Sequence, residues 1–389
     1  MSMRNHIHKK AFYRQTGLTL VEIMVAITLS LVILAGVIEM FVATKQTYRV
    51  EEGLSRVQEN ARYAMTTIAK DIRMAGYAGC TSDINNLLDE GHPSYDPSLF
   101  DMSQAITAWE YTSGGGTAPG DTYTVSTLSP TGRALTEWES RVLVGSPGTL
   151  TTRNLASSLQ NLVVPGTDVI VVKYAGGNSG VRPTGKTPAN AGAIPVNGAS
   201  NIASGTIIMI TDCSGSDVFQ TIPNPNANTL VFSNSGTLSP GNKNPGAYDF
   251  SHSYKESADI LVFRSYAYYI GEGSNGRPAL FRGVYTTGAI AASEIVEDVE
   301  NLQILYGEDT GADDIPDKYV TAASVTDPTK ISAVRISMVV STPENTRMNS
   351  ESKSLTLPGM GGTIITSLND RKYRYVFSKT IKIRNKGKL

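Results

Sequence analysis

The sequence predicts an α+β fold, in which one long N-terminal helix packs on a large antiparallel β-rich head. First, no proline occurs between Leu18 and Tyr77, and the apolar pattern of this stretch fits one helix. Second, the rest of the chain breaks into short apolar runs between clusters of Gly, Pro, Asn and Ser, which is typical of strands and turns. Third, no alternation of strands and helices follows, so we expect antiparallel pairing.

Residues 18–42 are expected to span a membrane. This segment is almost wholly apolar, and Glu22 and Glu39 are its only charges. About 20 apolar residues at ~1.5 Å rise per residue cross a hydrocarbon core of ~30 Å. Four basic residues and no acid precede the segment, namely Arg4, Lys9, Lys10 and Arg14. Positive charge on this side predicts that the N-terminus stays cytoplasmic and that the rest of the chain is exported.

Residues 43–75 are expected to continue the same helix with an amphipathic pattern. Apolar side chains recur at spacings of four and three, at Val50, Leu54, Val57, Ala61, Ala64, Ile68, Ile72 and Ala75. Polar side chains occupy mostly other faces, among them Arg56, Gln58, Glu59, Arg62, Lys70 and Asp71. Gly76 and Gly79 then supply the stop signal. We expect the apolar stripe to pack against the head.

These signals divide the chain into three parts. They are a leader, 1–17, a helix, 18–75, and a β-rich head, 76–389, with loop-rich insertions around 81–165, 176–203 and 223–251. Candidate strands in the head are 169–174, 206–211, 229–232, 260–270, 279–285, 302–306, 333–340 and 373–383. The last strand shows the clearest alternation of apolar and polar residues, with Tyr375 and Phe377 on one face and Arg374 and Lys382 on the opposite, solvent face.

Composition excludes several classes of function. Removing the four basic residues of the leader from a total of 34 leaves 30 against 35 acidic residues, a net charge of −5. A mildly acidic chain is a poor match for nucleic acid or anionic lipid, so we expect no nucleic-acid partner. Only two cysteines and, outside the leader, two histidines are present, so the usual Cys/His zinc cluster cannot form.

The junction between leader and helix has an unusual order. A secretory signal is cut after its apolar run, whereas here the only plausible cut, at Gly17, precedes the run. Gly17, an apolar Leu18, then Thr-Leu-Val, and Glu22 five residues past the cut resemble the class III signal of type IV prepilins. The resemblance implies cleavage between Gly17 and Leu18 by the prepilin peptidase, followed by methylation of the new N-terminus.

Glu22 is the charge that this signal singles out. A carboxylate near the membrane interior is costly and usually has a partner or a function. The resemblance implies that its partner is the N-terminal amine of a neighbouring subunit, so that Glu22 sets register during docking. Alternatively, the carboxyl lies close enough to the cytoplasmic face to be hydrated or protonated.

Further blocks resemble the PilW family, minor pilins of the type IV pilus. The blocks are 58–64, 71–80 with its Asp-Ile-Arg-Met-Ala-Gly-Tyr run, 212–213, 217–219, 295–307, 334–337 and 375–377. The resemblance covers the first 80 residues closely and the last 180 or so in patches. It implies a structural protein rather than an enzyme, with no cofactor. No residue qualifies as catalytic, because no nucleophile elbow, phosphate loop or paired acids stand out.

An exported head bears on the two cysteines, Cys80 and Cys213. In an oxidising periplasm a disulfide between them is the simplest expectation, and it would tie the helix end to a strand. A pair of buried free thiols is the alternative, which cysteine counting cannot decide.

Three other patterns suggest ligand sites. The run 271–276 matches GxGxxG, but Arg277-Pro278 and a strand follow it, so we expect a hairpin rather than a dinucleotide site. Acids crowd one loop and could wrap Ca²⁺, at Asp309, Asp313, Asp314 and Asp317, but a solvated turn is the favoured reading. The basic and aromatic tail, 371–388, could bind single-stranded nucleic acid, although the two faces of one strand explain it better.

The resemblance implies a minor pilin that supports twitching motility and adhesion by helping to prime pilus growth, in a tip complex. Its implied partners are the prepilin peptidase, the other minor pilins, the major pilin, the inner-membrane assembly platform and a tip adhesin. It would sit in the inner membrane by one span with its head in the periplasm, and later in the pilus near the tip. The alternatives are a minor pseudopilin of a type II secretion system and a signal-anchored periplasmic enzyme or binding protein.

Overall fold

The computed structural model describes residues 17–81, 83–113, 118–127, 129–142, 152–232, 238–244, 249–285, 290–343 and 345–385. The chain divides into two compact units, of which the first ends at Glu52 and the second begins at Gly53. Every strand of the described residues lies in the second unit. A helical segment joined to an antiparallel β-rich head confirms the predicted α+β class.

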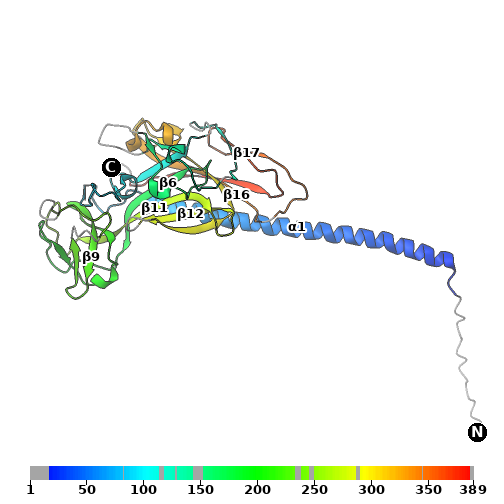
Figure 1. The fold of residues 1–389 in the computed structure, drawn as a ribbon, viewed down its shortest axis with the longest axis horizontal. Coiled ribbons are helices and arrows are strands. Elements are labelled where there is room, and N and C mark those ends of the chain that lie inside the picture. Colours follow the sequence, from blue (N-terminus) through cyan, green and yellow to red (C-terminus); the bar gives the residue numbers. More distant parts are fainter. Residues whose placement is uncertain are drawn as a thin grey trace, which may run out of the picture. The chain divides into compact units, whose positions relative to one another are not determined.

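Helix α1 runs from Leu20 to Met74, a length of 55 residues, and so crosses the boundary between the units (Figure 1). It ends where the sequence places its stop signal, because Gly76 adopts φ +73°, a conformation that favours glycine. The part of α1 in the second unit buries one stripe, made of Gly53, Val57, Ala61, Ala64, Met65, Ile68, Ala69, Asp71 and Ile72. Most of these side chains are small, which lets the helix backbone come close to the head.

The largest sheet has 12 strands, with the path β5-β4-β2-β6-β11-β8-β9-β10-β7. The bounds along this path are Arg153–Asn154, Trp138–Ser140, Ile106–Tyr111, Val169–Asn178, Asp259–Glu272, Thr206–Asp212, Gly215–Asn224, Thr229–Phe232 and Ala193–Pro195. Off the path, β1 (Ile84–Asn86) pairs with β9, and β13 (Ile290–Glu297) pairs with β12 (Pro278–Tyr285), which pairs with β11. In Figure 1 β6, β11 and β12 lie side by side, and the green strands around β9 gather to one side of them.

Two smaller sheets complete the head. The four-stranded sheet has the order β15-β14-β16-β19, with bounds Lys318–Val320, Val299–Glu308, Ile331–Ser341 and Arg374–Lys382. The three-stranded sheet has the order β17-β18-β3, with bounds Ser354–Thr356, Ile364–Thr366 and Thr122–Thr124. Pairing is antiparallel except for β1 with β9 and β3 with β18, which are parallel. These exceptions involve three-residue strands that join segments more than 100 residues apart, which no local pattern predicts.

Short helices connect the strands. Helix α2 (Pro97–Phe100) is one turn, which Asp96 caps by accepting a hydrogen bond from the Ser98 amide at 2.9 Å. The 3₁₀ turns η1 to η5 are Leu135–Glu137, Ser157–Leu159, Ala199–Asn201, Ala322–Ser324 and Pro328–Lys330. Most of them lie in the segments that the sequence predicts to be rich in loops.

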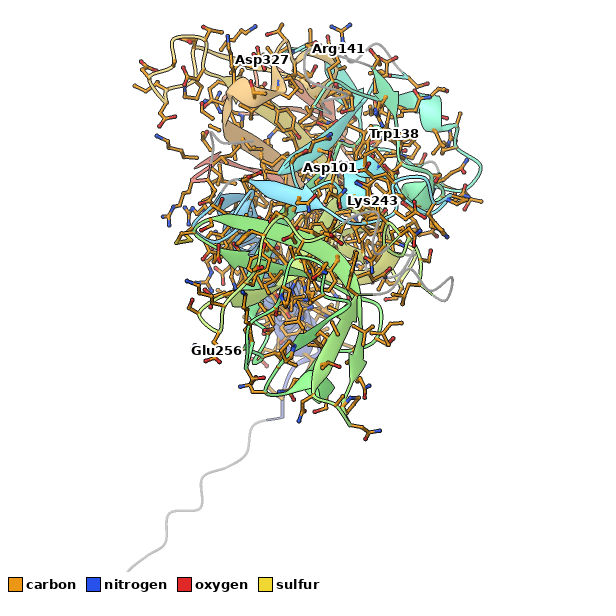
Figure 2. The ribbon with its side chains drawn as sticks, turned by 90° about the vertical axis from the view of Figure 1, so that its left-hand side faces the viewer. Asp101, Trp138, Arg141, Lys243, Glu256 and Asp327 are labelled. Carbon is orange, nitrogen blue, oxygen red and sulfur yellow. A yellow bond between two sulfur atoms is a disulfide. The ribbon has the colours of Figure 1, made fainter. Side chains whose placement is uncertain are left out.

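The apolar core of the head has three parts. The largest joins the buried stripe of α1 to strands of the 12-stranded and four-stranded sheets. A second lies among β8, β9 and β10, and a third lies under the three-stranded sheet. Both tryptophans, Trp109 and Trp138, are fully buried in the first part. Charged side chains such as Arg141 and Glu256 lie at opposite ends of the head's exterior (Figure 2).

Candidate functional site

The predicted processing site opens helix α1. Residues 20–74 contain the one helix of the described chain that is long and apolar enough to cross a membrane, with a mean hydropathy of 2.6 over its best 18 residues. None of that window is buried within the protein. Its apolar side chains therefore lie uncovered by the described part of the chain, as expected of a surface that contacts lipid or another protein.

Thr19 and Glu22 form a capping box at the start of α1. The Glu22 amide donates to Thr19 Oγ1 at 3.3 Å, and Glu22 Oε2 accepts from the Thr19 amide at 2.9 Å. The Thr19 hydroxyl also donates to Glu22 Oε2, at 2.9 Å. A Thr-x-x-Glu sequence satisfies two helix N–H groups that would otherwise lack acceptors. This role is not among those predicted for Glu22 above, although the spacing of three residues between Thr19 and Glu22 indicates it.

The C-terminal end of α1 is held by a buried carboxylate. Asp71 is only 4 % exposed, which corrects the expectation that it lies on the polar face. Its Oδ1 accepts from the Tyr174 hydroxyl on β6 at 2.9 Å, and its Oδ2 accepts from the Tyr268 hydroxyl on β11. Burial, together with the charge of Asp71, raises the pKa of both tyrosines above the ordinary range, so both hydroxyls stay donors. We name Asp71, Tyr174 and Tyr268 the helix seat.

Backbone contacts extend the helix seat. The Gly76 amide donates to the Lys173 carbonyl at 2.9 Å, and the Ala175 amide donates to the Tyr77 carbonyl at 2.8 Å. The residues after the helix thus pair with β6 directly. At the other end of the buried stripe, a Cβ on Gly53 would come within 3.1 Å of Thr342 Cγ2, so the helix and head are in close contact there. The side-chain amide of Asn385, through Nδ2, donates to the Ala75 carbonyl at 3.3 Å.

Lys173, which precedes Tyr174 of the helix seat on β6, is fully buried. Its Nζ donates to the Ser98 carbonyl at 2.8 Å and to the Pro97 carbonyl at 3.3 Å. Burial lowers the pKa of this amine to about 7, although the charges of Asp101 and Asp96 act in the opposite direction. Lys173 therefore joins the central strand to α2 without a direct ion pair among the described residues.

The structure joins Cys80 and Cys213 by a disulfide across 133 residues, with their Cα atoms 5.1 Å apart. Cys80 lies just past the helix seat, and Cys213 lies in the tight turn between β8 and β9. Both residues are exposed, unlike the buried thiols of the alternative reading. Gly79 packs against Thr211 here, since a Cβ on it would come within 3.0 Å of Thr211 Cγ2.

A polar cluster that the sequence analysis missed lies beside this turn. His252 Nε2 lies 3.0 Å from Asp212 Oδ1, and His252 Nδ1 lies 3.0 Å from Ser251 Oγ. The trio resembles a Ser-His-Asp arrangement, but the Ser251 hydroxyl donates to Asp217 Oδ2 at 2.9 Å, and the Tyr254 hydroxyl donates to the same oxygen at 2.5 Å. A serine whose proton points to a carboxylate is not activated by the imidazole. The cluster holds the segment 251–254 on the β8–β9 hairpin.

The acidic loop uses its carboxylates on its own backbone. Asp317 Oδ2 accepts from the amides of Thr310 and Gly311, at 2.7 and 3.0 Å, and from the Thr310 hydroxyl at 2.6 Å. Asp309 accepts from the amides of Asp313 and Asp314. Hydrogen bonds from Thr310 and Gly311 lower the pKa of Asp317. Within the described residues, no group of three His, Cys, Asp or Glu side chains is placed to hold a metal ion.

Two other patterns have structural roles. The GxGxxG run forms the hairpin between β11 and β12, in which the Gly273 amide donates to the Arg277 carbonyl at 2.8 Å. Arg374 is expected on the solvent face of the last strand, and that expectation is wrong, because its side chain is only 4 % exposed. Its Nε donates to Glu300 at 2.6 Å and its guanidinium also pairs with Asp370, because these acids on β14 and in the preceding turn offer it a bidentate site.

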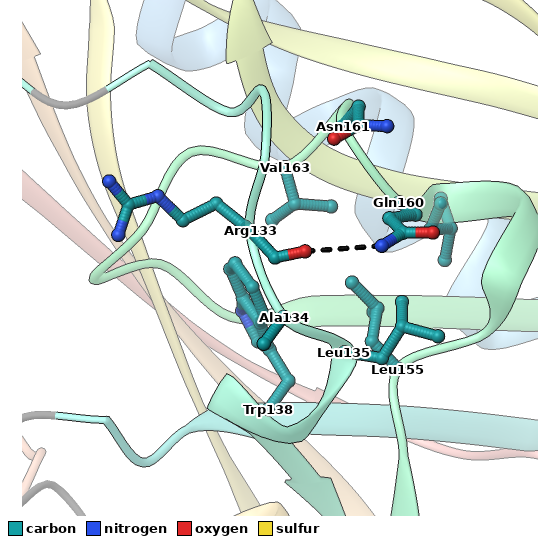
Figure 3. A pocket seen from close by; sticks show the side chains of 9 residues that line it. Arg133, Ala134, Leu135, Trp138, Leu155, Gln160, Asn161 and Val163 are labelled. Atoms are coloured by element: carbon teal, nitrogen blue, oxygen red, sulfur yellow. Dashed lines mark hydrogen bonds between the residues drawn. The ribbon is translucent and has the colours of Figure 1, made fainter.

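A small hollow lies in the loop-rich part of the head between residues 133 and 163. It is lined by Arg133, Ala134, Leu135, Trp138, Leu155, Leu159, Gln160, Asn161 and Val163, and has no room for a water-sized molecule (Figure 3). The Gln160 amide closes it by donating to the Arg133 carbonyl at 3.2 Å. It is a packing defect in the surface rather than a ligand site.

Comparison with known proteins bears on both ends of the chain. Residues 267–385, from the middle of β11 to the segment after β19, match the family described as "Type IV Pilus-assembly protein W". Residues 13–38, which include Gly17, Leu18 and Glu22, match the prokaryotic N-terminal methylation motif. No curated protein matches the chain significantly.

Among solved structures, a type IV-like pilin from Thermus thermophilus is similar, at 17% identity over 47% of this chain and 85% of that chain, with a TM-score of 0.22. The likeness to type IV pilins therefore depends on the two sequence matches. These matches confirm the resemblance drawn from the junction and from the blocks around residues 295–307 and 375–377. The chain carries the two signatures of a PilW-like type IV pilin, the methylation motif at its N-terminus and the PilW region toward its C-terminus.

Proposed function

We propose that the chain is a minor pilin, a structural protein that is made as an inner-membrane prepilin with its head in the periplasm. After cleavage between Gly17 and Leu18 and N-methylation, it would join other minor pilins and the major pilin on the assembly platform, and prime pilus growth near the tip. The observation that carries this proposal is the methylation motif at 13–38, which runs into an apolar segment of α1 whose most apolar 18 residues are not buried within the protein.

Two surfaces support an assembly role. The membrane-length segment of α1 exposes large apolar side chains such as Leu29, Ile33 and Phe41, which can contact lipid first and sister helices later. In the head, the helix seat and the disulfide fix the end of α1 to the central strands. A pull on the helix would therefore reach the head through buried contacts. Tip position, motility and adhesion follow from the resemblance and are proposals here.

The mature N-terminus tests the processing step. Mass spectrometry of the protein purified from membranes should find a chain that begins with a methylated Leu18. The basic leader would be absent, because the only plausible cut precedes the apolar run. Recovery of a chain that still begins at Met1 would instead support a signal-anchored enzyme or binding protein. Loss of secretion, with normal piliation, in a deletion strain would support a type II pseudopilin.

Replacing Glu22 separates its charge from its capping role. Glu22→Gln keeps the capping box, since glutamine serves at this position, and removes the carboxylate; Glu22→Ala removes both. We expect both variants to be processed and to reside in the membrane, and both to enter pili at least tenfold less than the wild type in immunoblots of sheared pili. The control is Glu39→Ala, which changes the other acid of the apolar segment. If Glu22→Gln entered pili as well as the wild type, the charge of Glu22 would not be needed for pilus assembly.

A further inference from the structure

Two buried acids, Glu110 and Asp168, lie where the three sheets of the head meet. Glu110 belongs to β2 and Asp168 directly precedes β6, both in the 12-stranded sheet. They are 1 % and 2 % exposed. Trp109 on β2 pairs with Val169 on β6, so Glu110 and Asp168 occupy the next opposite positions, and the charge of Asp168 acts on Glu110. From the three-stranded sheet, the Tyr123 hydroxyl donates to Glu110 Oε1 at 2.7 Å. From the four-stranded sheet, the Ile304 amide donates to Asp168 Oδ2 at 2.8 Å.

Among the described residues, the titratable groups that act on the pair are acids and tyrosine hydroxyls. Glu139 on β4 lies directly opposite Glu110 in register, Asp121 precedes β3, and the buried hydroxyl of Tyr306 on β14 is near both acids. None of the ion pairs in the described part of the chain involves Glu110 or Asp168. Two buried like charges with no cation nearby cannot both stay ionised.

The hydrogen bonds around the two acids indicate which carboxyl group is protonated when only one of them is ionised. Asp168 accepts from two backbone amides, those of Ile304 and Tyr111, which favour its ionised form. The second oxygen of Glu110, Oε2, faces no donor and so gains a hydrogen bond only by carrying its own proton toward Asp168. We propose that Glu110 and Asp168 share one proton at neutral pH, and that the joint between the three sheets is therefore weaker in alkaline than in acid solution.

The two buried acids hold their protons to a higher pH in the folded chain than in the unfolded chain, so rising pH lowers the stability of the folded state. Burial and the neighbouring carboxylate raise the pKa of Glu110 well above its ordinary value, and burial raises the pKa of Asp168 to about 7. In the unfolded chain both acids lose their protons near pH 4. The folded state thus holds extra protons above that pH, and its stability is complete below about pH 4 and is lost as the pH rises through 7. Lys173 acts in the opposite direction, because its pKa is lowered by burial.

Unfolding by urea at several pH values tests the proposal. The full chain in a nonionic detergent is followed by the fluorescence of Trp109 and Trp138, both buried in the head. Glu110→Gln keeps the size of the side chain and gives Asp168 an amide donor that needs no proton. Comparing this variant with the wild type cancels the contributions of Lys173 and of all other groups. The control is Glu272→Gln, an exposed carboxylate at the end of β11.

The expected result is a change in the ratio of the two unfolding equilibrium constants. For one extra proton, the wild type should lose up to about tenfold per pH unit relative to Glu110→Gln between about pH 5 and pH 8. At about pH 8 the variant should be the more stable protein, and Glu272→Gln should follow the wild type throughout. A constant ratio between Glu110→Gln and the wild type over this range would overturn the proposal.

An infrared measurement on the wild type covers the case in which Glu110→Gln does not fold. At about pH 6 a shared proton gives a C=O stretch of a protonated carboxyl group, although ordinary carboxyl groups are ionised there. Asp298, whose pKa burial also raises, and the two acids of the apolar segment, Glu22 and Glu39, are the competing sources, so the band should persist in Asp298→Asn, in Glu22→Gln and in Glu39→Ala. If no such band exists at about pH 6, or if one of these variants removes it, the shared proton does not exist.

Discussion

Replacing Cys80 with serine is expected to lower the free energy of unfolding of the head by about 4–5 kcal/mol. The disulfide joins two cysteines that are 133 residues apart in sequence. The conformational entropy that such a bond removes from the unfolded chain grows with the length of the loop that it closes. It also joins the end of α1 to the turn between β8 and β9, which are otherwise connected through Thr211, whose hydroxyl donates to the Ala78 carbonyl at 3.2 Å. Urea unfolding of the full chain in detergent, followed by tryptophan fluorescence, measures the loss.

Two controls separate the cross-link from the side chains. Cys213→Ser should cost as much as Cys80→Ser, and the double variant should cost no more than either, because all three remove the same bond. Reduction of the wild type should give the same loss, since both cysteines are exposed to the reductant. A difference below about 1 kcal/mol would show that the unfolded chain gains little freedom when the bond is absent.

The long helix could be predicted because its signals are local. An uninterrupted apolar run, a stripe at helical spacing and a stop at Gly76 all lie within one stretch of sequence. The strands 229–232 and 279–285 are predicted in the same way, since each is a short, largely apolar run between turn signals, and they agree with β10 and β12 to within one residue. Gly17, Leu18 and Glu22 came from the spacing of a motif, and their proposed roles await the experiments above.

Strands that carry polar side chains are not predicted from the sequence. β9 carries Asp217 and Gln220, both fully buried, which no alternation of apolar residues reveals. The side-chain amide of Gln220 donates to the Gly205 carbonyl, and its backbone N–H donates to Asn242 Oδ1. These partners, 15 and 22 residues away in sequence, satisfy the buried polar groups of Gln220. β13 reads as Ile-Ala-Ala-Ser-Glu-Ile-Val-Glu, with polar and small residues that suit a helix as well as an edge strand.

The same limit applies to the buried charges. Asp71 was assigned to the polar face of the helix because its hydrogen-bond donors, on β6 and β11, are 103 and 197 residues away in sequence. Arg374 was assigned to solvent because Glu300 is on a different strand. A charge reads as exposed in a sequence unless its partner is visible, and these partners exist only in the folded head.

The helix seat gives the second large prediction. Asp71→Ala should lower the free energy of unfolding of the head by about 3–4 kcal/mol, because it leaves the hydroxyls of Tyr174 and Tyr268 buried without their acceptor. Urea unfolding followed by tryptophan fluorescence measures this loss. Trypsin reports the detachment directly, because Arg73, exposed in the last turn of α1, becomes a better cleavage site once the helix end leaves the head.

The neighbouring Lys70 is the matched control, since it is exposed one residue earlier on the same turn of α1, and Lys70→Ala should change stability by less than about 0.5 kcal/mol. Rescue distinguishes lost hydrogen bonds from a lost charge. In the Asp71→Ala background, Tyr174→Phe together with Tyr268→Phe removes the orphaned hydroxyls and should recover part of the stability. Stability of Asp71→Ala equal to that of Lys70→Ala would mean that apolar packing of Ile68 and Ile72 alone holds the helix on the head. A pull on the helix would then reach the sheet through those side chains rather than through a hydrogen-bonded carboxylate.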